Sequence, residues 1–299
     1  MPQYIAYSLR IQSEFEIPEF HQASFPDGNL DVAIASNTVG SIGTPAERGV
    51  TWKASANLLE LRVPSVANFL VVDGRNIHIE LFDPTKEREM RVYLLGSVIA
   101  ALLYQRGDLV MHACSIATPN GATLFCGKSG AGKSTLAATL ALNGYPMIAD
   151  DVTVIRNSDG CGFYAPPSFP ISRLCGDVVS LLNWTKAKYA PLELEERKFQ
   201  TSSPRFASKA QLPTRIAFLI PDAVERISIR PFSPLESISN LVKRSYRYRF
   251  AVGMGLKEAH FKNITELAQS VQCFEIRRPI GLQNLDSSLR ALMDFVRDE

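Results

Sequence analysis

A glycine-rich segment near the middle of the chain constrains the fold more than any other feature. Residues 127–134 have the sequence GKSGAGKS and match the pattern GxxxxGK[ST] at every fixed position. An apolar run, Ala122 to Cys126, precedes the segment, and a run with helical character, Ser134 to Asn143, follows it. Glycine permits the backbone turn that points several N–H groups at one anion, and the helix adds the positive end of its dipole. The pattern therefore predicts a strand, a phosphate-binding loop and a helix in succession.

The residues of this loop are the candidate nucleotide-binding residues. Lys133 supplies a mobile positive charge, and the Ser134 hydroxyl suits the shell of Mg²⁺, which is held largely through oxygen ligands and phosphates. We therefore expect a nucleoside triphosphate, ATP, with Mg²⁺ as cofactors. A glycine-rich turn that binds nothing would not explain Lys133 and Ser134 together. The predicted cofactor-binding residues are Gly127, Ser129, Gly130, Ala131, Gly132, Lys133, Ser134 and Thr135.

Two adjacent carboxylates follow the next buried strand, Met147 to Ala149. Asp150 and Asp151 stand at the carboxyl end of that strand, where side chains face a bound phosphate group. Phosphoryl transfer to a hydroxyl needs a base to receive the proton, and neighbouring carboxylates raise each other's proton affinity. One of the pair would serve as base and the other would support Mg²⁺, in an order that the residues alone leave open. A turn or helix cap is the alternative for such a pair, and the loop upstream favours the catalytic role.

The composition excludes several classes of protein. The 299-residue chain is 46% hydrophobic with a net charge of +2, which predicts a soluble protein with no nucleic-acid or membrane partner. Five scattered cysteines without CxxC spacing indicate neither a disulfide framework nor a zinc site, so a cytoplasmic location is expected. The N-terminus lacks a signal-peptide pattern, and the most apolar stretch, Val92 to Tyr104, is too short to span a bilayer.

Short strand-like runs separated by turn residues fill the first 90 residues. Leu59 to Val63 and Ile77 to Leu81 alternate as half-buried strands do, whereas Gln22 to Thr51 is loop-like, with a strand at Val32 to Ala35 left open. Val92 to Tyr104 has apolar residues at helical spacing. We therefore predict a β-rich N-terminal module over 1–90 and an α/β domain over 91–299. Further strands are expected at 152–156, 215–220, 226–231 and 273–277, and helices at 175–184, 235–246, 263–271 and 283–298.

The order and spacing of several motifs resemble the HPr kinase/phosphorylase family. They are Met111-His112-Ala113, the loop, the helix ending at Gly144-Tyr145, and Ile148-Ala149-Asp150-Asp151. The resemblance extends from residue 108 onward, strongly to Ile155, and includes Pro170 to Leu174, which is similar to an Arg-Leu segment of HPr-kinase-related proteins. It implies a P-loop kinase domain of the HPr kinase/phosphoenolpyruvate carboxykinase type, with a mixed sheet and flanking helices. The N-terminal part is more similar to the short module of HPr-kinase-like proteins from peptide-modification gene clusters, which include lasso-peptide precursor kinases.

The resemblance also implies roles for individual residues. Asp150 matches the carboxylate that takes the proton from the acceptor serine, and Asp151 would support the metal together with Ser134. His112 matches an active-site histidine that pairs with the catalytic carboxylate, although a lone histidine in a strand is more often a core residue. Arg173 would neutralise charge on the nucleotide or acceptor, a surface arginine being the alternative. Thr135 departs from the acidic residue common in the bacterial enzymes, which puts their metal arrangement in doubt here.

These features together predict a Mg-ATP-dependent serine kinase that acts on a peptide or small protein, with a ribosomal lasso-peptide precursor as one candidate acceptor. The chain has no clear counterpart of the segment tied to phosphorolysis, which favours kinase over phosphorylase activity. A nucleotide-sensing module with negligible turnover and a small-molecule or carboxykinase-like phosphotransferase remain the alternatives. The resemblance also allows a homo-oligomer.

Two charged segments are not part of the predicted kinase site. Lys243 to Phe250 is basic and aromatic, which favours a solvated helix end over an acidic-peptide site, with nucleic acid third. The second is an acidic cluster, Glu193, Glu195 and Glu196, followed by Arg197-Lys198 and Lys209. It carries both signs of charge and is interpreted as a solvated segment, with a lid over the acceptor as the alternative.

Overall fold

The chain divides into two compact units with interleaved sequences. The computed structural model describes residues 1–299 apart from 27, 40–49, 159–161, 183–197, 282–284 and 298–299, so the segment Glu193 to Arg197 lies outside the described residues. The first unit is Met1–Val110 with Tyr246–Lys262, and the second is Met111–Ser245 with Asn263–Glu299. The predicted boundary at residue 90 is placed differently by this division, which gives the helices over 87–105 to the first unit. No described helix is both long enough and apolar enough to cross a membrane.

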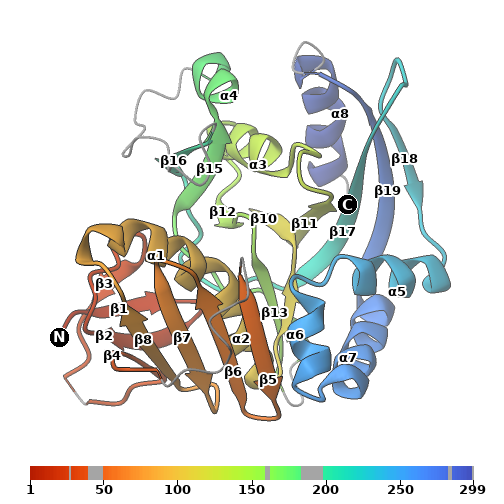
Figure 1. Ribbon diagram of the computed structural model, residues 1–299. Helices are drawn as coiled ribbons and strands as arrows, with labels where there is room; N and C mark the ends of the chain where they lie inside the picture. The colour runs from red at the N-terminus through yellow and green to blue at the C-terminus, as the bar shows by residue number, and fades with distance from the viewer. Residues whose placement is uncertain (27, 40–49, 159–161, 183–197, 282–284, 298–299) are drawn as a thin grey trace. The chain divides into compact units, whose positions relative to one another are not determined.

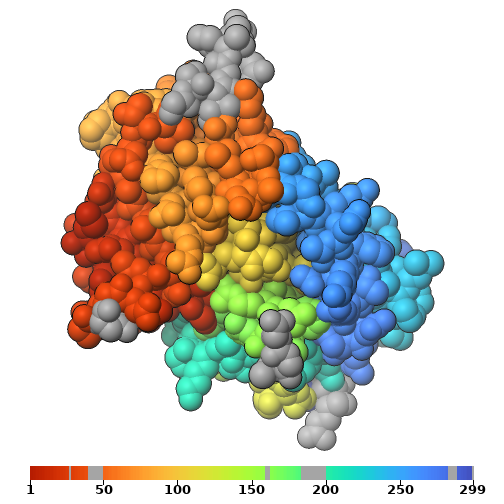
Figure 2. Space-filling model, turned by 90° about the horizontal axis from the view of Figure 1, so that it is seen from below, coloured from red at the N-terminus to blue at the C-terminus, as the bar shows by residue number. Residues whose placement is uncertain are grey.

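An eight-stranded sheet built from residues 3–81 forms most of the first unit. Its strand order is β3-β1-β2-β4-β8-β7-β6-β5, with β4 paired in parallel to β2 and β8 and the other pairs antiparallel. The strands are β1 (Gln3–Ala6), β2 (Leu9–Ser13), β3 (His21–Ala23), β4 (Val32–Ser36), β5 (Thr51–Ser55), β6 (Leu58–Val63), β7 (Ala67–Val72) and β8 (Asn76–Leu81). β4 settles the strand that the sequence left open. These strands form the red to orange surface in Figure 2.

Alternation of buried and half-exposed residues in β6 and β7 follows from strand geometry, because successive side chains point to opposite faces. Leu59, Leu61 and Val63 are all buried, as their spacing predicted.

The helical part of the first unit is interrupted, and it is apolar only beyond its first, charged piece. The helix predicted over 92–104 exists, but it is three pieces: α1 (Glu87–Tyr93), a π-helical turn (Leu94–Val98) and α2 (Ile99–Gln105). A short helix that the sequence did not predict, α6 (Tyr248–Gly253), takes up the aromatic end of the segment Lys243 to Phe250. Phe250 is buried, and its ring lies 5.0 Å from that of Trp52 between centroids. Part of that segment is therefore core rather than solvated surface.

A six-stranded mixed sheet is the framework of the second unit. Its order is β12-β10-β11-β17-β19-β18, and the three neighbours β11, β17 and β19 are parallel to one another (Figure 1). The strands are β10 (Ala113–Thr118), β11 (Gly121–Gly127), β12 (Met147–Ala149), β17 (Pro213–Asp222), β18 (Ser228–Pro231) and β19 (Gln272–Pro279). β10 and β11 form an antiparallel hairpin, with Thr118 paired to Gly121 at the turn. Smaller pairings join β13 (Thr153–Ser158) to β14 (Gly162–Tyr164) and β15 (Ile171–Cys175) to β16 (Lys198–Ser202).

Helices flank this sheet, which makes the second unit a mixed α/β structure. Its helices are α3 (Lys133–Leu142), α4 (Gly176–Leu181), α5 (Pro234–Lys243) and α8 (Leu285–Arg297), while α7 (Lys257–Ser270) begins in the first unit. Leu136 and Leu140 of α3 pack with Phe125 of β11 and Phe295 of α8 in one buried cluster. The strand and helix behind the glycine-rich loop are therefore fixed by a common core.

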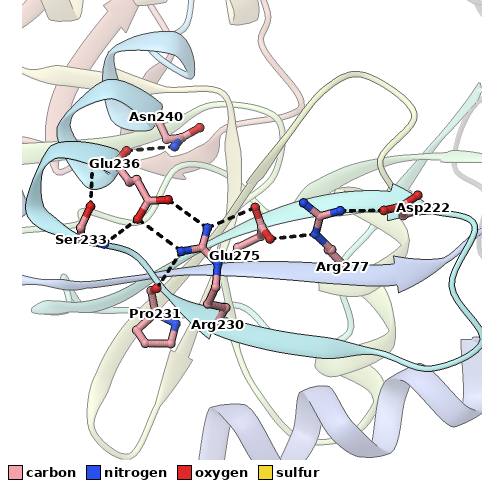
Figure 3. A network of polar contacts seen from close by, with 8 residues as sticks. All are labelled: Asp222, Arg230, Pro231, Ser233, Glu236, Asn240, Glu275 and Arg277. Carbon is pink, nitrogen blue, oxygen red and sulfur yellow. Dashed lines mark hydrogen bonds and ion pairs between the residues drawn. The ribbon is translucent and has the colours of Figure 1, made fainter.

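A polar network orders the entry to α5. Ser233 and Glu236 form a reciprocal capping box, with the Ser233 backbone N–H donating to the Glu236 carboxylate at 2.8 Å. The same carboxylate accepts two hydrogen bonds from the Arg230 guanidinium, which also pairs with Glu275 on β19 (Figure 3). Arg277 then joins Glu275 to Asp222 at the end of β17. The network ties the edge strand β18 and helix α5 to the central parallel strands.

Candidate active site

The glycine-rich loop leaves β11 and enters α3 through two residues with positive φ. Gly130 has φ +79° and Gly132, which caps α3, has φ +89°, a backbone region that side chains with a Cβ rarely adopt. A Cβ added at Gly132 would stand 2.5 Å from Nη2 of Arg278, so the guanidinium would have to shift to make room for it. The Ala131 N–H donates to the Lys128 carbonyl at 3.1 Å and closes the turn. The succession of strand, glycine-rich turn and helix is therefore the one that the pattern predicted.

Lys133 is folded inward against its own loop. Its side chain is 6% exposed, and Nζ donates to the carbonyls of Gly127 and Lys128 at 3.1 and 3.2 Å. A third contact, 2.9 Å long, joins Nζ to Nε2 of His112. Burial lowers the pKa of this ammonium group, and the nearby thiol of Cys114 and carboxylates oppose that effect. The lysine is thus held at the mouth of the loop, beside the carboxylate pair.

Asp150 is the most buried carboxylate of this site. It is 6% exposed and accepts hydrogen bonds from the backbone N–H of Asp151 at 2.9 Å and of Arg173 at 3.3 Å. The Ser134 hydroxyl also hydrogen-bonds to its side chain. Burial, reinforced by the charge of Asp151, raises the pKa of Asp150 to about 6. A carboxyl group with a pKa in this range can both lose and accept a proton near neutral pH.

His112 joins Lys133 to the second carboxylate. Nδ1 lies 3.2 Å from the backbone carbonyl of Asp151 and 3.4 Å from its carboxylate. Because the lysine donates to Nε2, this nitrogen carries no proton. The imidazole is then the neutral tautomer that has its N–H at Nδ1. Burial lowers the pKa of His112, which favours this neutral form. The resemblance implied a histidine paired with the catalytic carboxylate, and the carboxylate found beside this histidine is that of Asp151.

Asp151 is exposed and conformationally unusual. Its side chain is 41% exposed, and its φ of +69° is uncommon for a residue other than glycine. The two adjacent carboxylates therefore have different environments, because Asp150 is buried and Asp151 is partly exposed. Backbone outliers such as this φ cluster at functional sites, where the surrounding structure holds them in place.

The other predicted site residues are distributed around the loop. Arg173 is on β15 and reaches the site through its backbone N–H, which donates to Asp150. Ser129 lies in the exposed part of the turn. Thr135 follows Ser134 in the first turn of α3 and lines a separate cavity with Gly130 and Gly132.

The residues present fit a Mg-nucleotide. The loop supplies backbone N–H groups at a helix start, a lysine and a hydroxyl bonded to a buried carboxylate, which are the parts that hold phosphates and their metal. Among the described residues, no three His, Cys, Asp or Glu side chains are arranged to hold a metal by themselves. Mg²⁺ would therefore depend on Ser134, one carboxylate of the Asp150–Asp151 pair and the phosphates together.

Arg278 is a site residue that the sequence analysis missed. It stands near the carboxyl end of β19, and its Nε and Nη2 donate to the Ala131 carbonyl at 3.1 and 2.7 Å. The parallel strands β11 and β19 both end at this edge of the sheet, one in the loop and the other in Arg278. The sequence signal was a basic pair, Arg277-Arg278, at a strand end, but only the strand order reveals that this end adjoins the loop.

Comparisons with known proteins give a limited result. No protein-family model matches the chain, and no curated protein matches it in sequence. Among solved structures, the chain is similar to the Hpr(Ser) kinase/phosphatase from Coxiella burnetii, with 13% sequence identity and a TM-score of 0.31. That alignment covers 62% of this chain and 87% of the other. The function proposed below therefore rests on the geometry of the site.

Proposed function

We propose that this chain is a Mg²⁺-dependent phosphotransferase that moves the γ-phosphoryl group of ATP to the hydroxyl of a serine in a peptide or small protein. The observation that carries the proposal is the contact between Ser134 of the loop and the buried carboxylate of Asp150, beside Lys133. A nucleotide-binding turn without turnover would not need a carboxylate with a raised pKa at this place. The serine acceptor, a lasso-peptide precursor among the candidates, is supported by the sequence resemblance alone.

The chain's own groups account for most of what phosphoryl transfer requires. The loop N–H groups and Lys133 would hold the phosphates and neutralise charge as it develops, since the transition state is loose and needs positioning and positive charge. Bound Mg²⁺ would add positive charge on the phosphate oxygens. The serine oxygen forms its bond to the γ-phosphorus as the bond to the ADP oxygen breaks, and the serine proton passes to a carboxylate. His112 would hold Lys133 and Asp151 in position.

Asp150 is proposed as the base and Asp151 as the metal-supporting group. With a pKa of about 6, Asp150 binds a proton more strongly than an ordinary carboxylate does and is still ionised at neutral pH, so it can accept the serine proton. Asp151 is more exposed and is restrained by His112, which suits a group that shares Mg²⁺ with water. Asp150 hydrogen-bonds to Ser134, and Asp151 is the next residue in the chain. Because the two carboxylates are so close, a separate variant of each is needed to tell the base from the metal support.

The test is transfer of labelled γ-phosphate from Mg-ATP to serine peptides, with Lys133→Ala, Asp150→Asn and Asp151→Asn in parallel. We expect Lys133→Ala to lower turnover roughly 10²- to 10³-fold, as the loss of one stabilising charge does elsewhere. Asp150→Asn should lose turnover at every Mg²⁺ concentration, whereas Asp151→Asn should recover part of it as Mg²⁺ is raised. Lys209→Ala, which removes an exposed lysine outside the site, is the matched control.

The opposite results would assign other roles. Recovery of Asp150→Asn by Mg²⁺, with none for Asp151→Asn, would exchange the base and the metal support. Tight ATP binding without transfer to any serine peptide or small molecule would favour the nucleotide-sensing alternative.

A further inference from the structure

A cavity of about 250 Å³ lies against the phosphate-binding loop, on a side that the carboxylate pair does not reach. It shares Gly130, Gly132 and Thr135 with the loop, but Lys133, Ser134, Asp150 and His112 are not among its lining residues. Its volume is just below the about 300 Å³ at which pockets for drug-sized ligands begin, which suits one base or sugar rather than a whole nucleotide.

The direction of the loop explains why a phosphate chain would lead to this cavity. Consecutive residues of a helix are about 100° apart around its axis, so Ser134 and Thr135 face different sides of the first turn of α3. Ser134 faces Asp150, and Thr135 faces the cavity. A triphosphate with its γ-phosphate beside Lys133 and Asp150 must leave the loop by another side. Thr135 marks the side where the cavity opens.

The cavity combines apolar walls with a few polar groups. Leu219 and Leu292 line it, as does Val178 of α4. Asp177 is an exposed lining residue whose Oδ1 accepts a hydrogen bond from the Val178 N–H at 2.8 Å, which leaves Oδ2 to accept one from a ligand. Small-molecule sites have this composition, with apolar surface for a ring and isolated polar groups that fix its orientation.

Arg278 is the cationic group of the cavity. Its N–H groups are held by the carbonyls of Ala131 and Pro279, which fixes the plane of the guanidinium. Guanidinium groups stack on flat aromatic rings through their faces, and such stacking does not use the N–H groups. The side chain thus both braces the loop and offers a surface for a base.

One residue that lines the cavity has a buried hydroxyl for which the described part of the chain offers no hydrogen-bond partner. Ser288 of α8 lines the cavity and is 4% exposed, and its Oγ has no hydrogen-bond partner among the described residues. Leaving a buried hydroxyl unsatisfied is costly, and most such groups in native proteins have a protein, water or ligand partner. Oγ itself is fully buried, so a rotation about the Cα–Cβ bond of Ser288 would be needed to turn the hydroxyl toward the cavity that the residue lines. A polar ligand in the cavity would then supply the partner that this hydroxyl lacks.

We propose that this cavity binds the nucleoside part of the nucleotide, a purine base with its ribose, between Arg278, Ser288 and Asp177. The inference rests on the proposed function, since it requires a nucleoside triphosphate with its phosphates in the loop. It goes further in stating which residues distinguish ATP from a bare phosphate chain. Ser288 and Asp177 supply hydrogen bonds to the base or sugar, and Arg278 supplies the stacking surface.

The test compares the affinities of Mg-ATP and Mg-tripolyphosphate by titration calorimetry. Tripolyphosphate carries the same phosphate chain without a nucleoside, so the wild-type protein should bind it more weakly than ATP. Ser288→Ala should weaken ATP binding roughly three- to tenfold, the effect of one hydrogen bond, and leave tripolyphosphate unchanged. Cys175→Trp, at an exposed lining position, should reduce ATP affinity to that of tripolyphosphate, with Cys175→Ser as its matched control.

The controls separate the two proposals. Lys133→Ala should weaken both ligands, because it acts on the phosphates. Equal ATP affinity in the wild type, Ser288→Ala and Cys175→Trp would overturn the nucleoside site while the phosphate loop stands. Failure of the wild type to bind either ligand would overturn the proposed function and this inference with it. Ser288→Ala should not lower the thermal unfolding midpoint of the free protein; a lower midpoint together with unchanged ATP affinity would mean a structural role only.

Discussion

Gly132 has two separate reasons to be glycine. Its φ of +89° lies in the region where a side chain is strained, and its missing Cβ leaves room for the Arg278 guanidinium. The first reason is the conformation of the backbone at Gly132 itself. The second is the position of Arg278, a residue much later in the sequence. The loop pattern predicts only the first, since nothing local in the sequence indicates what approaches this glycine.

The two reasons can be measured separately. We expect Gly132→Ala to cost more than the about 1–2 kcal/mol of a left-handed non-glycine residue, because it also displaces Arg278. Gly144→Ala is the matched control: its φ is +100° and an added Cβ meets nothing within 4 Å. Denaturant unfolding and nucleotide titration should show Gly144→Ala less stable with normal binding, and Gly132→Ala impaired in both. Equal stability losses and equal binding in the two variants would contradict the clash with Arg278.

At the scale of elements, local patterns predicted which segments form strands and helices better than which ones become neighbours. β17 and β19 were expected at 215–220 and 273–277 and occupy Pro213–Asp222 and Gln272–Pro279. The predicted end of β19 stopped one residue short of Arg278. A strand is predicted from the alternation of apolar and polar residues, and this alternation stops where the strand leaves the core. Polar residues at the end of a strand, such as Arg278, are therefore missed.

Helix α5 offers a test of how an element start is specified. Ser233→Ala removes the cap side chain that accepts the Glu236 N–H, and should destabilise the second unit by about 1 kcal/mol. Glu236→Gln is the comparison, because glutamine can keep the reciprocal bond to the Ser233 backbone while losing the charge that pairs with Arg230. We expect urea denaturation to rank Ser233→Ala as the less stable variant, and only the Glu236→Gln effect to vanish in high salt. The reverse ranking would show that the ion pair, rather than the cap, orders α5.

At the scale of the whole molecule, the buried Asp150 makes stability depend on pH. Its folded pKa of about 6 is above the ordinary 3.8, so the native state holds this proton where the unfolded state has lost it. The cost of the buried charge is therefore absent below about pH 4 and fully present above about pH 6. It amounts to about 3 kcal/mol for a shift of roughly two units.

Asp150→Asn should remove this dependence. The wild type should gain up to about 3 kcal/mol relative to the variant between pH 8 and pH 4, measured as the free energy of unfolding of the second unit. Comparing the pH dependence, rather than one value, cancels the constant cost of placing an amide beside two N–H donors. A difference between wild type and variant that stays the same from pH 4 to pH 8 would mean that Asp150 titrates normally.

The sequence predicted the phosphate loop, its lysine and the carboxylate pair because each is encoded within a short stretch. It did not predict the contact of Arg278 with the loop, or the cavity beside them. Both depend on β11, β17 and β19 lying side by side in the sheet. Likewise, the resemblance paired His112 with the catalytic carboxylate, assigned to Asp150, whereas His112 contacts the neighbouring Asp151, a residue 39 positions away in the sequence. Non-local pairing of this kind depends on topology, which local propensity does not encode.

The hydrogen bonds from Arg278 to Ala131 can form only late in the synthesis of the polypeptide. They join residues 147 positions apart, so the loop at Gly132 is synthesised long before the residue that braces it. Domains fold largely as units during translation, at about 5–20 residues per second. During synthesis the nascent chain therefore carries a complete glycine-rich loop for several seconds before Arg278 emerges, and in that interval the loop lacks the side chain that braces it.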